Sequence, residues 1–522
     1  MLRPLVAMTA AAVLLTGCSG GDDKKSDSAS GDKGNNPAAT PTTPELATFD
    51  PPKAFQAVAA SALAEEKGHS TAEPEVAMVG MTAVANSYSG AVGQSVTGTQ
   101  KPWQTLATET TDGSVVINDA SRPIAVQLDG KPAVAVAYYQ RVKGTGTQKP
   151  GVSVLFRWLD PADGKPLSEA TVDATALLGD DEVNSGLPGG LTDFFADPAT
   201  GRLAVGVAPA SLIGAKSGII TVTGDPVTKK GAGVPFMRPA GISKGVVVGA
   251  QGEDNTRRTL ALVDAATGRV TKSGLLPGLW GLGSTGSVGG KYAYLYGQKY
   301  DPKLGDGEYV GSVYAVDPAT GTVVQTKSAV KKTSFLLDYT CVADRQKSVV
   351  CTADPGYDEA EIIGFDDTTG KKAWGYTAAN AARAVPEVTA AFHGVVYATS
   401  EHKTVLMDAL TGKDIPAPTP TATPTDSATP GTSSTPGENP TPTDGSTPTD
   451  GSTSTDGPTP TYGSTDGTTP SGGETPGAPV PAQPDLELQS PAGVSEYGGV
   501  YLHKLDLSDE SSGILQVLKA VG

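Results

Sequence analysis

The sequence predicts an all-β protein folded as a single β-propeller of seven blades, with eight blades as the alternative. Three observations predict it. One turn recurs along the chain, two short strands rich in Val, Tyr, Ile and Leu precede its best copies, and the copies are spaced by about 50 residues. Short strands with regular turn signals indicate all-β architecture, and a unit of this length with about four strands is typical of a propeller blade.

The recurring turn contains Asp, small residues and then Thr-Gly. Its best copies are 263–269, 316–322, 365–371 and 407–413, and looser ones are 160–165 and 225–230. In a tight hairpin, Asp bonds to the turn backbone and Gly takes the positive-φ position. A similar stretch, 197–202, lies outside the register and is interpreted as another hairpin within a unit.

Six such units fit between about Ile124 and Ile415, which leaves residues 70–115 and 485–521 over. The second remainder predicts two strands, Tyr497–His503 and Gly513–Lys519, and Val76–Val84 adds another. An unclosed blade exposes unpaired strand edges. We therefore expect N- and C-terminal strands to share one closing blade, which makes seven.

The first residues have the features of a secretory signal. After Arg3, an apolar run of eleven residues, Leu5–Leu15, is too short to span a membrane. It ends in Leu-Thr-Gly-Cys (15–18), which resembles the bacterial lipoprotein lipobox. That resemblance implies that Cys18 is diacylglycerylated and becomes the mature N-terminus, on the extracytoplasmic face of the cell membrane. The alternative is an ordinary signal in which Cys18 is incidental.

Composition then divides the chain. Residues 1–17 are the signal peptide, 18–48 a disordered tether, 49–415 the propeller, 416–484 a disordered insertion and 485–522 the strands that complete the propeller. The insertion is rich in Pro, Thr, Ser and Gly, and no Lys or Arg occurs between Lys413 and Lys504. Such composition indicates an extended, solvated surface insertion, and O-glycosylation stays open.

Two stretches resemble a known family. Gly-Ser-Val-Tyr-Ala-Val-Asp-Pro-Ala-Thr-Gly (311–321) resembles the blade motif of PQQ-like, quinoprotein-type β-propellers, and Lys-Lys-Ala-Trp (371–374) resembles the strand that follows it. The whole architecture resembles propeller lipoproteins of high-GC Gram-positive bacteria. Enzymes of the family use vicinal cysteines, an acidic Ca²⁺ site and a tryptophan in almost every blade. This chain has no adjacent cysteines, and Trp374 alone follows a recurring turn, so we expect no cofactor.

Cys341 and Cys351 are predicted to face each other across a hairpin of strands 339–342 and 348–351. An extracytoplasmic location permits their oxidation, so we expect a disulfide after slight local adjustment of the strands. Two free core thiols are the alternative. No histidine lies nearby, so a metal site is not expected.

Loops between the second and third strands of the units are long and often acidic, and they should gather on one face. Their candidate ligand-contacting residues are Glu253, Asp254, Tyr300, Asp306, Glu308, Tyr309, Tyr357, Asp358 and Glu359. The acidic residues lack the spacing of a calcium loop, which favours a solvated acidic rim. Tyr292, Tyr294 and Tyr296 alternate along one strand and are interpreted as packing between blades.

Charge and motifs narrow the function. With 39 basic and 56 acidic residues the net charge is −17, which argues against a nucleic-acid partner. Catalytic triads, nucleophile elbows and phosphate loops are not found in the sequence. The expected function is that of a non-enzymatic, lipid-anchored scaffold that binds a protein or small ligand outside the cell. The alternatives are a cofactor-binding or enzymatic quinoprotein-like propeller, and a cell-envelope assembly or structural factor.

Overall fold

The computed structural model describes residues 46–62, 75–87, 89–107, 115–144, 147, 149–179, 189–209, 219–252, 258–276, 280–300, 309–330, 339–353, 360–381, 383–401, 403–416, 490–504 and 513–521. Leu46–Gly522 forms one compact unit, separate from Met1–Glu45. The predicted signal peptide, Cys18, most of the tether and nearly all of the Pro/Thr insertion lie outside the described residues.

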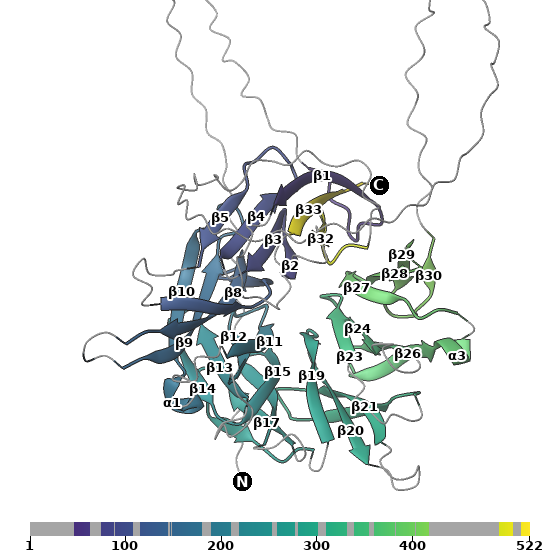
Figure 1. The fold of residues 1–522 in the computed structure, drawn as a ribbon. Helices are drawn as coiled ribbons and strands as arrows, with labels where there is room; N and C mark the ends of the chain where they lie inside the picture. The colour runs from purple at the N-terminus through teal and green to yellow at the C-terminus, as the bar shows by residue number, and fades with distance from the viewer. Residues whose placement is uncertain are drawn as a thin grey trace, which may run out of the picture. The chain divides into compact units, whose positions relative to one another are not determined.

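Eight β-sheets follow one another around a common centre and form a single β-propeller (Figure 1). The first four blades contain β2 (Glu75–Val79), β3 (Thr82–Ser87), β4 (Gly90–Ser95) and β5 (Trp103–Leu106); β6 (Val115–Ala120), β7 (Ile124–Leu128), β8 (Lys131–Val142), β9 (Gly151–Leu159) and β10 (Pro166–Asp173); β11 (Gly190–Ala196), β12 (Leu203–Ala208), β13 (Ile220–Asp225) and β14 (Lys230–Val234); and β15 (Met237–Ser243), β16 (Val246–Gln251), β17 (Thr259–Asp264) and β18 (Val270–Lys272).

The next three blades repeat this meander, and the eighth is assembled from both ends of the unit. The fifth blade contains β19 (Trp280–Val288), β20 (Ala293–Tyr300), β21 (Tyr309–Val316) and β22 (Val323–Lys327), and the sixth contains β23 (Tyr339–Ala343), β24 (Ser348–Ala353), β25 (Glu361–Asp366) and β26 (Lys371–Thr377). The seventh contains β27 (Glu387–Phe392), β28 (Val395–Ser400), β29 (Lys403–Asp408) and β30 (Asp414–Ile415). The eighth contains β31 (Gly493–Ser495), β32 (Gly498–Lys504), β33 (Gly513–Ala520) and β1 (Phe55–Ala62). Two single-turn helices, α1 (Thr175–Leu178) and α3 (Ala378–Ala381), follow β10 and β26.

The prediction of seven blades is wrong, and the alternative of eight is right. Residues 75–106 do not contribute to the closing blade but form a complete four-stranded sheet of their own. The N-terminal partner of the closing blade is β1, which was not predicted as a strand because its sequence, Phe-Gln-Ala-Val-Ala-Ala-Ser-Ala, is poor in β-formers. Pairing overrides that propensity, since β1 runs antiparallel to β33 from Phe55–Ala520 to Ala62–Ile514.

The recurring turn is confirmed as the link between the third and fourth strands of six consecutive blades. At 264–269, Oδ1 of Asp264 accepts the Thr267 amide at 2.9 Å, and the Gly268 amide donates to the Asp264 carbonyl at 2.9 Å. Gly268 has φ +68°, a conformation that strongly favours glycine. The off-register copy 197–202 joins β11 to β12, the first two strands of a blade, as expected.

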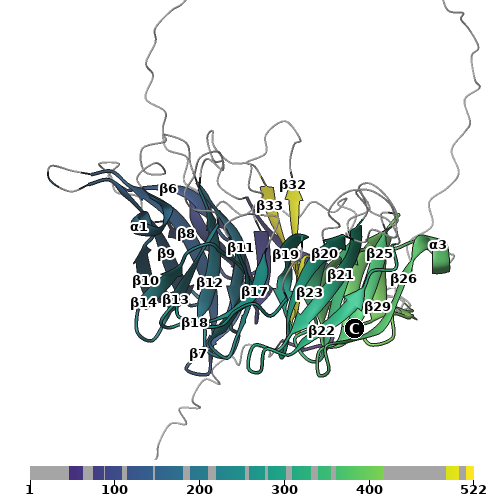
Figure 2. The same ribbon diagram turned by 90° about the horizontal axis from the view of Figure 1, so that it is seen from below.

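Hydrophobic side chains of neighbouring sheets pack against each other in separate clusters, such as the one that buries Phe156, Trp158 and Phe194. Figure 2 shows the sheets side-on, with successive strands of each blade running up and down. Among the described residues, no helix is long and apolar enough to cross a membrane.

Candidate functional site

Two faces of the propeller follow from this connectivity. We call the side that carries the turns between first and second and between third and fourth strands the turn face. The loop face is the opposite side, where second and third strands are joined and where one blade leads to the next. Seven of the predicted ligand-contacting residues fall in loop-face segments outside the described residues: Glu253, Asp254, Asp306, Glu308, Tyr357, Asp358 and Glu359.

Tyr300 and Tyr309 were expected in a loop but belong to strands. Tyr300 ends β20, Tyr309 begins β21, and the two are direct partners in the antiparallel register. The two tyrosines therefore form the last strand pair before the loop of the β20–β21 hairpin. The strands pair further than the polar sequence of 298–308 suggested. Tyr309 is half-buried.

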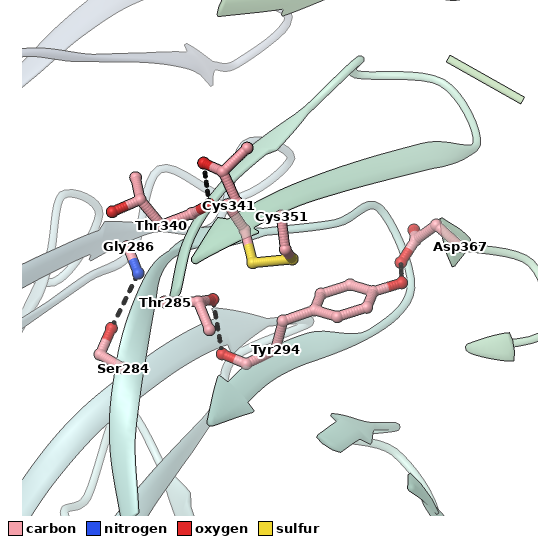
Figure 3. The surroundings of a disulfide bond; sticks show 9 residues. Ser284, Thr285, Gly286, Tyr294, Thr340, Cys341, Cys351 and Asp367 are labelled. Atoms are coloured by element: carbon pink, nitrogen blue, oxygen red, sulfur yellow. Dashed lines mark hydrogen bonds between the residues drawn. A yellow bond between two sulfur atoms is a disulfide. The ribbon is translucent and has the colours of Figure 1, made fainter. Parts of the chain in front are cut away.

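Cys341 and Cys351 form the predicted disulfide, between directly opposite residues of β23 and β24 (Figure 3). Their Cα atoms are 4.0 Å apart, closer than the about 4.5–5.5 Å of ordinary opposite pairs, so the strands draw together locally. Both side chains are buried. They share one hydrophobic cluster with Tyr292, Tyr294 and Tyr296, which confirms that these tyrosines pack between blades.

A buried carboxylate joins the same two blades at the turn face. Asp367 follows β25, and its carboxylate accepts the Tyr294 hydroxyl at 2.9 Å and the backbone amides of Lys291 and Tyr292 at 2.8 and 3.3 Å (Figure 3). Burial raises the pKa of Asp367 in spite of these bonds. Burial, with the adjoining carboxylate, also raises the pKa of the Tyr294 hydroxyl, so that the hydroxyl stays a donor.

A second tyrosine–carboxylate pair lies at the loop-face ends of β23 and β25, where it also meets the residues that follow β22. Glu361 accepts the hydroxyls of Tyr339 at 2.7 Å and Ser328 at 2.6 Å, and the Ala329 amide at 2.9 Å. Burial next to this carboxylate raises the pKa of Tyr339. Donors from the protein itself occupy both carboxylates. We therefore interpret the two pairs as structural hydrogen-bonded contacts rather than as acids or bases for an external substrate.

Tryptophans fasten neighbouring blades: Trp158 donates to the Gly201 carbonyl of the third blade at 2.7 Å, and Trp103 and Trp374 bond to the recurring turn, of which the sequence pointed to Trp374. Trp374 donates to the Ala409 carbonyl of the next turn at 2.8 Å, and a Cβ built on Gly412 would lie 2.4 Å from its indole. Trp103 does the same in the first blade, donating to Pro161 at 2.9 Å beside Gly164. Trp103 was missed because the turn before it, 96–102, lacks the recurring motif.

The acceptor of the bonds from Trp103 and Trp374 recurs even where the donor changes. In each case the carbonyl belongs to the residue directly after the turn aspartate. Pro226 accepts Ser168 at 2.7 Å and Ala265 accepts Thr223 at 2.7 Å, each from the preceding blade. The repeated turn therefore presents a fixed backbone acceptor to its neighbour.

Polar groups also lie on the innermost strands. Asp119 on β6 accepts the Leu191 amide at the start of β11 at 2.7 Å and the Ala120 amide at 2.8 Å. Burial raises the pKa of Asp119 to about 6. Arg122 donates to the carbonyls of Phe194 and Gly286, which belong to the third and fifth blades. These side chains tie inner strands together at a place where the β6 and β11 registers are irregular.

An N-terminal strap, Leu46–Ala54, lies along the turn face. The Phe49 amide donates to the Glu496 carbonyl at 2.8 Å, the Asp50 carboxylate bonds to the His393 ring, and the Pro52 carbonyl accepts the Tyr397 hydroxyl at 2.6 Å. Leu46 packs on the cluster that contains Met78 and Val500. The strap thus contacts the seventh, eighth and first blades, across the place where the ring closes.

No group of three His, Cys, Asp or Glu side chains suited to a metal ion occurs within the described ranges. The polar constellations that the structure does describe are bonded internally, and their common chemistry is to hold blades together. The candidate functional surfaces are therefore the two faces of the ring.

Comparison with known proteins finds no matching family model and no matching curated protein. Solved structures do match. The uncharacterized protein lmo1340 of Listeria monocytogenes shares 12% identity over 73% of this chain and 99% of its own, with a TM-score of 0.33. The β-propeller domain of the Trilobed protease from Pyrococcus furiosus shares 11% over 57% and 82%, with a TM-score of 0.32. AztD of Citrobacter koseri shares 14% over 66% and 85%, with a TM-score of 0.27. The assignment as a β-propeller of eight blades rests on the sheets of this chain itself.

Proposed function

We propose that this protein is a lipid-anchored, extracytoplasmic β-propeller that acts as a non-enzymatic scaffold for a protein or small-ligand partner. The observation that carries the proposal is the N-terminal sequence, in which an apolar core ends in Leu-Thr-Gly-Cys at 15–18. The Cys341–Cys351 disulfide supports it, because disulfides persist in oxidising compartments outside the cytosol. Acylation at Cys18 would supply the anchor.

The propeller is proposed to be of the PQQ-like type. The packing of Trp103 and Trp374 against glycines of the following turns supports this, since the family resemblance implies such tryptophans. A scaffold role, rather than an enzymatic one, is favoured because the carboxylates of Asp367 and Glu361 are engaged by groups of the preceding blade.

The anchor is tested by membrane fractionation of cells that express the wild-type chain or Cys18→Ser. We expect the wild type in the membrane fraction and the variant in the medium or the soluble envelope fraction. Equal membrane retention of both would contradict lipid anchoring. The scaffold role is tested by cross-linking and purification from intact cells. Turnover or a spectral change on titration with a quinone would instead support the quinoprotein-like alternative, and failure to recover a specific partner would count against the scaffold.

A further inference from the structure

The turn face carries an exposed layer of cations, although the chain as a whole is strongly acidic. Each of the first seven blades places at least one exposed Lys or Arg in or beside its turns. These residues include Lys101, Lys131, Lys165, Lys229, Lys230, Lys244, Arg269, Lys291, Lys347, Lys371 and Lys413. The net charge of the chain is −17, so the excess of acidic residues lies elsewhere.

Several acidic residues of the same turns are buried or bonded within the turn. Asp197, Asp225, Asp344 and Asp367 are buried, and their carboxylates bond to turn amides or to the next blade. Hydrogen bonds from Thr267 and Thr368 hold the pKa values of Asp264 and Asp366 below the usual range. Four carboxylates of the turns are therefore buried, and the half-exposed Asp264 and Asp366 are bonded within their turns, whereas the lysines named above are exposed.

The exposed carboxylates among the described turn-face residues are few. They are Asp129, Asp163, Asp50 and Asp414, and the last three are bonded to Lys165, His393 and Arg383. An anionic surface that approached this face would meet exposed cations from seven blades and few exposed carboxylates.

The N-terminal strap lies on the same face. Its contacts with Glu496 and His393 are contacts with turns between first and second strands, and its end is bonded to Val521 just after β33. The predicted insertion instead lies between β30 and β31, where the chain crosses between blades on the loop face.

We propose that the turn face docks on an anionic phospholipid surface, so that the loop face points away from the membrane. The proposal rests on the proposed lipid anchor for the identity of the neighbouring surface. Lysines near an anionic leaflet are attracted to it, and the attraction falls off within a Debye length. Many such residues on one rigid face therefore suffice to orient the ring.

The test uses the full chain carrying Cys18→Ser, so that the result does not depend on acylation. Its binding is measured by flotation with phosphatidylcholine vesicles and with equimolar phosphatidylcholine/phosphatidylglycerol vesicles, at low and high salt. We expect salt-sensitive binding to the anionic vesicles alone. The triple reversal Lys230→Glu/Lys347→Glu/Lys413→Glu should weaken that binding by at least about tenfold.

The matched control reverses three exposed lysines toward the loop face, Lys143→Glu/Lys149→Glu/Lys403→Glu. It changes the net charge by the same amount and should weaken binding by less than about twofold, because these positions lie beyond a Debye length of the docked lipid. Thermal unfolding of both triple variants checks that each is folded. Binding to neutral vesicles, no binding to anionic vesicles, or an equal loss in both triple variants would overturn the proposal. Loss of membrane retention by Cys18→Ser in cells is a separate measurement that tests the anchor itself.

Discussion

At the scale of single residues, the structure uses titratable side chains as structural parts. Asp119 is the clearest example, because it is buried against two backbone amides with a pKa of about 6 in place of 3.8. A raised pKa means that the folded state holds the proton more tightly than the unfolded chain does. Ionisation of Asp119 therefore lowers the free energy of unfolding as the pH rises from about 4 to about 6.

The first prediction follows from that sign. Relative to Asp119→Asn, the wild type should lose at most about 3 kcal/mol of unfolding free energy between pH 4 and pH 7. Chemical denaturation of both proteins across this pH range measures the difference. Stability curves that run parallel would show that Asp119 does not titrate as its burial indicates.

The disulfide carries the second prediction. Cys341→Ser/Cys351→Ser should lower the unfolding free energy by about 2–3 kcal/mol, because the bridge closes a short loop in the unfolded chain and its sulfurs are packed among aromatic rings. Thermal unfolding should show a lower melting temperature. Treatment of the wild type with a reductant under mildly denaturing conditions should reproduce the shift, and an unchanged melting temperature would argue that the bridge adds nothing.

At the scale of elements, the repeated turn decides how blades meet. Its backbone carbonyl accepts a donor from the preceding blade, whether that donor is an indole or a hydroxyl. In the sixth blade Asp367 follows the turn aspartate Asp366. The carboxylate of Asp367, rather than a backbone carbonyl, accepts the hydroxyl of Tyr294 in the fifth blade. Such bonds fix the angle between neighbouring sheets without any recurring donor residue.

The third prediction concerns that aspartate. Asp367→Ala leaves the buried Tyr294 hydroxyl and the amides of Lys291 and Tyr292 without their acceptor, and should cost about 2–4 kcal/mol of unfolding free energy. Asp163→Ala, in the exposed part of another turn, is the matched control and should leave the unfolding free energy nearly unchanged. Similar small losses in both variants would mean that the fastening contributes little.

Much of the fold could be predicted at this scale. The turn motif correctly located the third and fourth strands of six blades, because Asp and Gly have local conformational roles that need no tertiary context. β1 was missed because it becomes a strand only by pairing with β33 at the other end of the chain. The role of Trp103 was missed because its indole packs against a glycine of the next blade, which the local sequence does not reveal. The positions of Asp119 and Arg122 depend on bulges and contacts between distant strands, which a local pattern does not encode.

At the scale of the whole molecule, the ring is held shut by β1 and the N-terminal strap. β1 supplies the fourth strand of the eighth blade, and the strap bonds to turns of the seventh and eighth blades while Leu46 packs on the cluster that contains Met78 of the first. The compact unit that contains the blades begins at Leu46.

The fourth prediction compares two truncations at this end. Deletion of residues 1–45 should leave the melting temperature unchanged, because the compact unit stays intact. Deletion of residues 1–62 removes β1 and leaves the edge of β33 unpaired, so it should cause aggregation or loss of the cooperative transition. Calorimetry and size-exclusion chromatography distinguish these outcomes. A soluble, cooperatively folded protein from the longer deletion would show that β1 is dispensable.

The shared blade also sets an order of events in time. β1 is made early, but its partner β33 lies at the opposite end of the sequence. At the usual ~5–20 residues per second of synthesis, β1 waits roughly half a minute or longer before a partner exists. Seven blades are able to form as the chain emerges, whereas the eighth requires every residue up to Ala520 to be on the same side of any membrane being crossed. The pairing of β1 with β33 can therefore form only after the chain up to Ala520 has arrived on one side of the membrane.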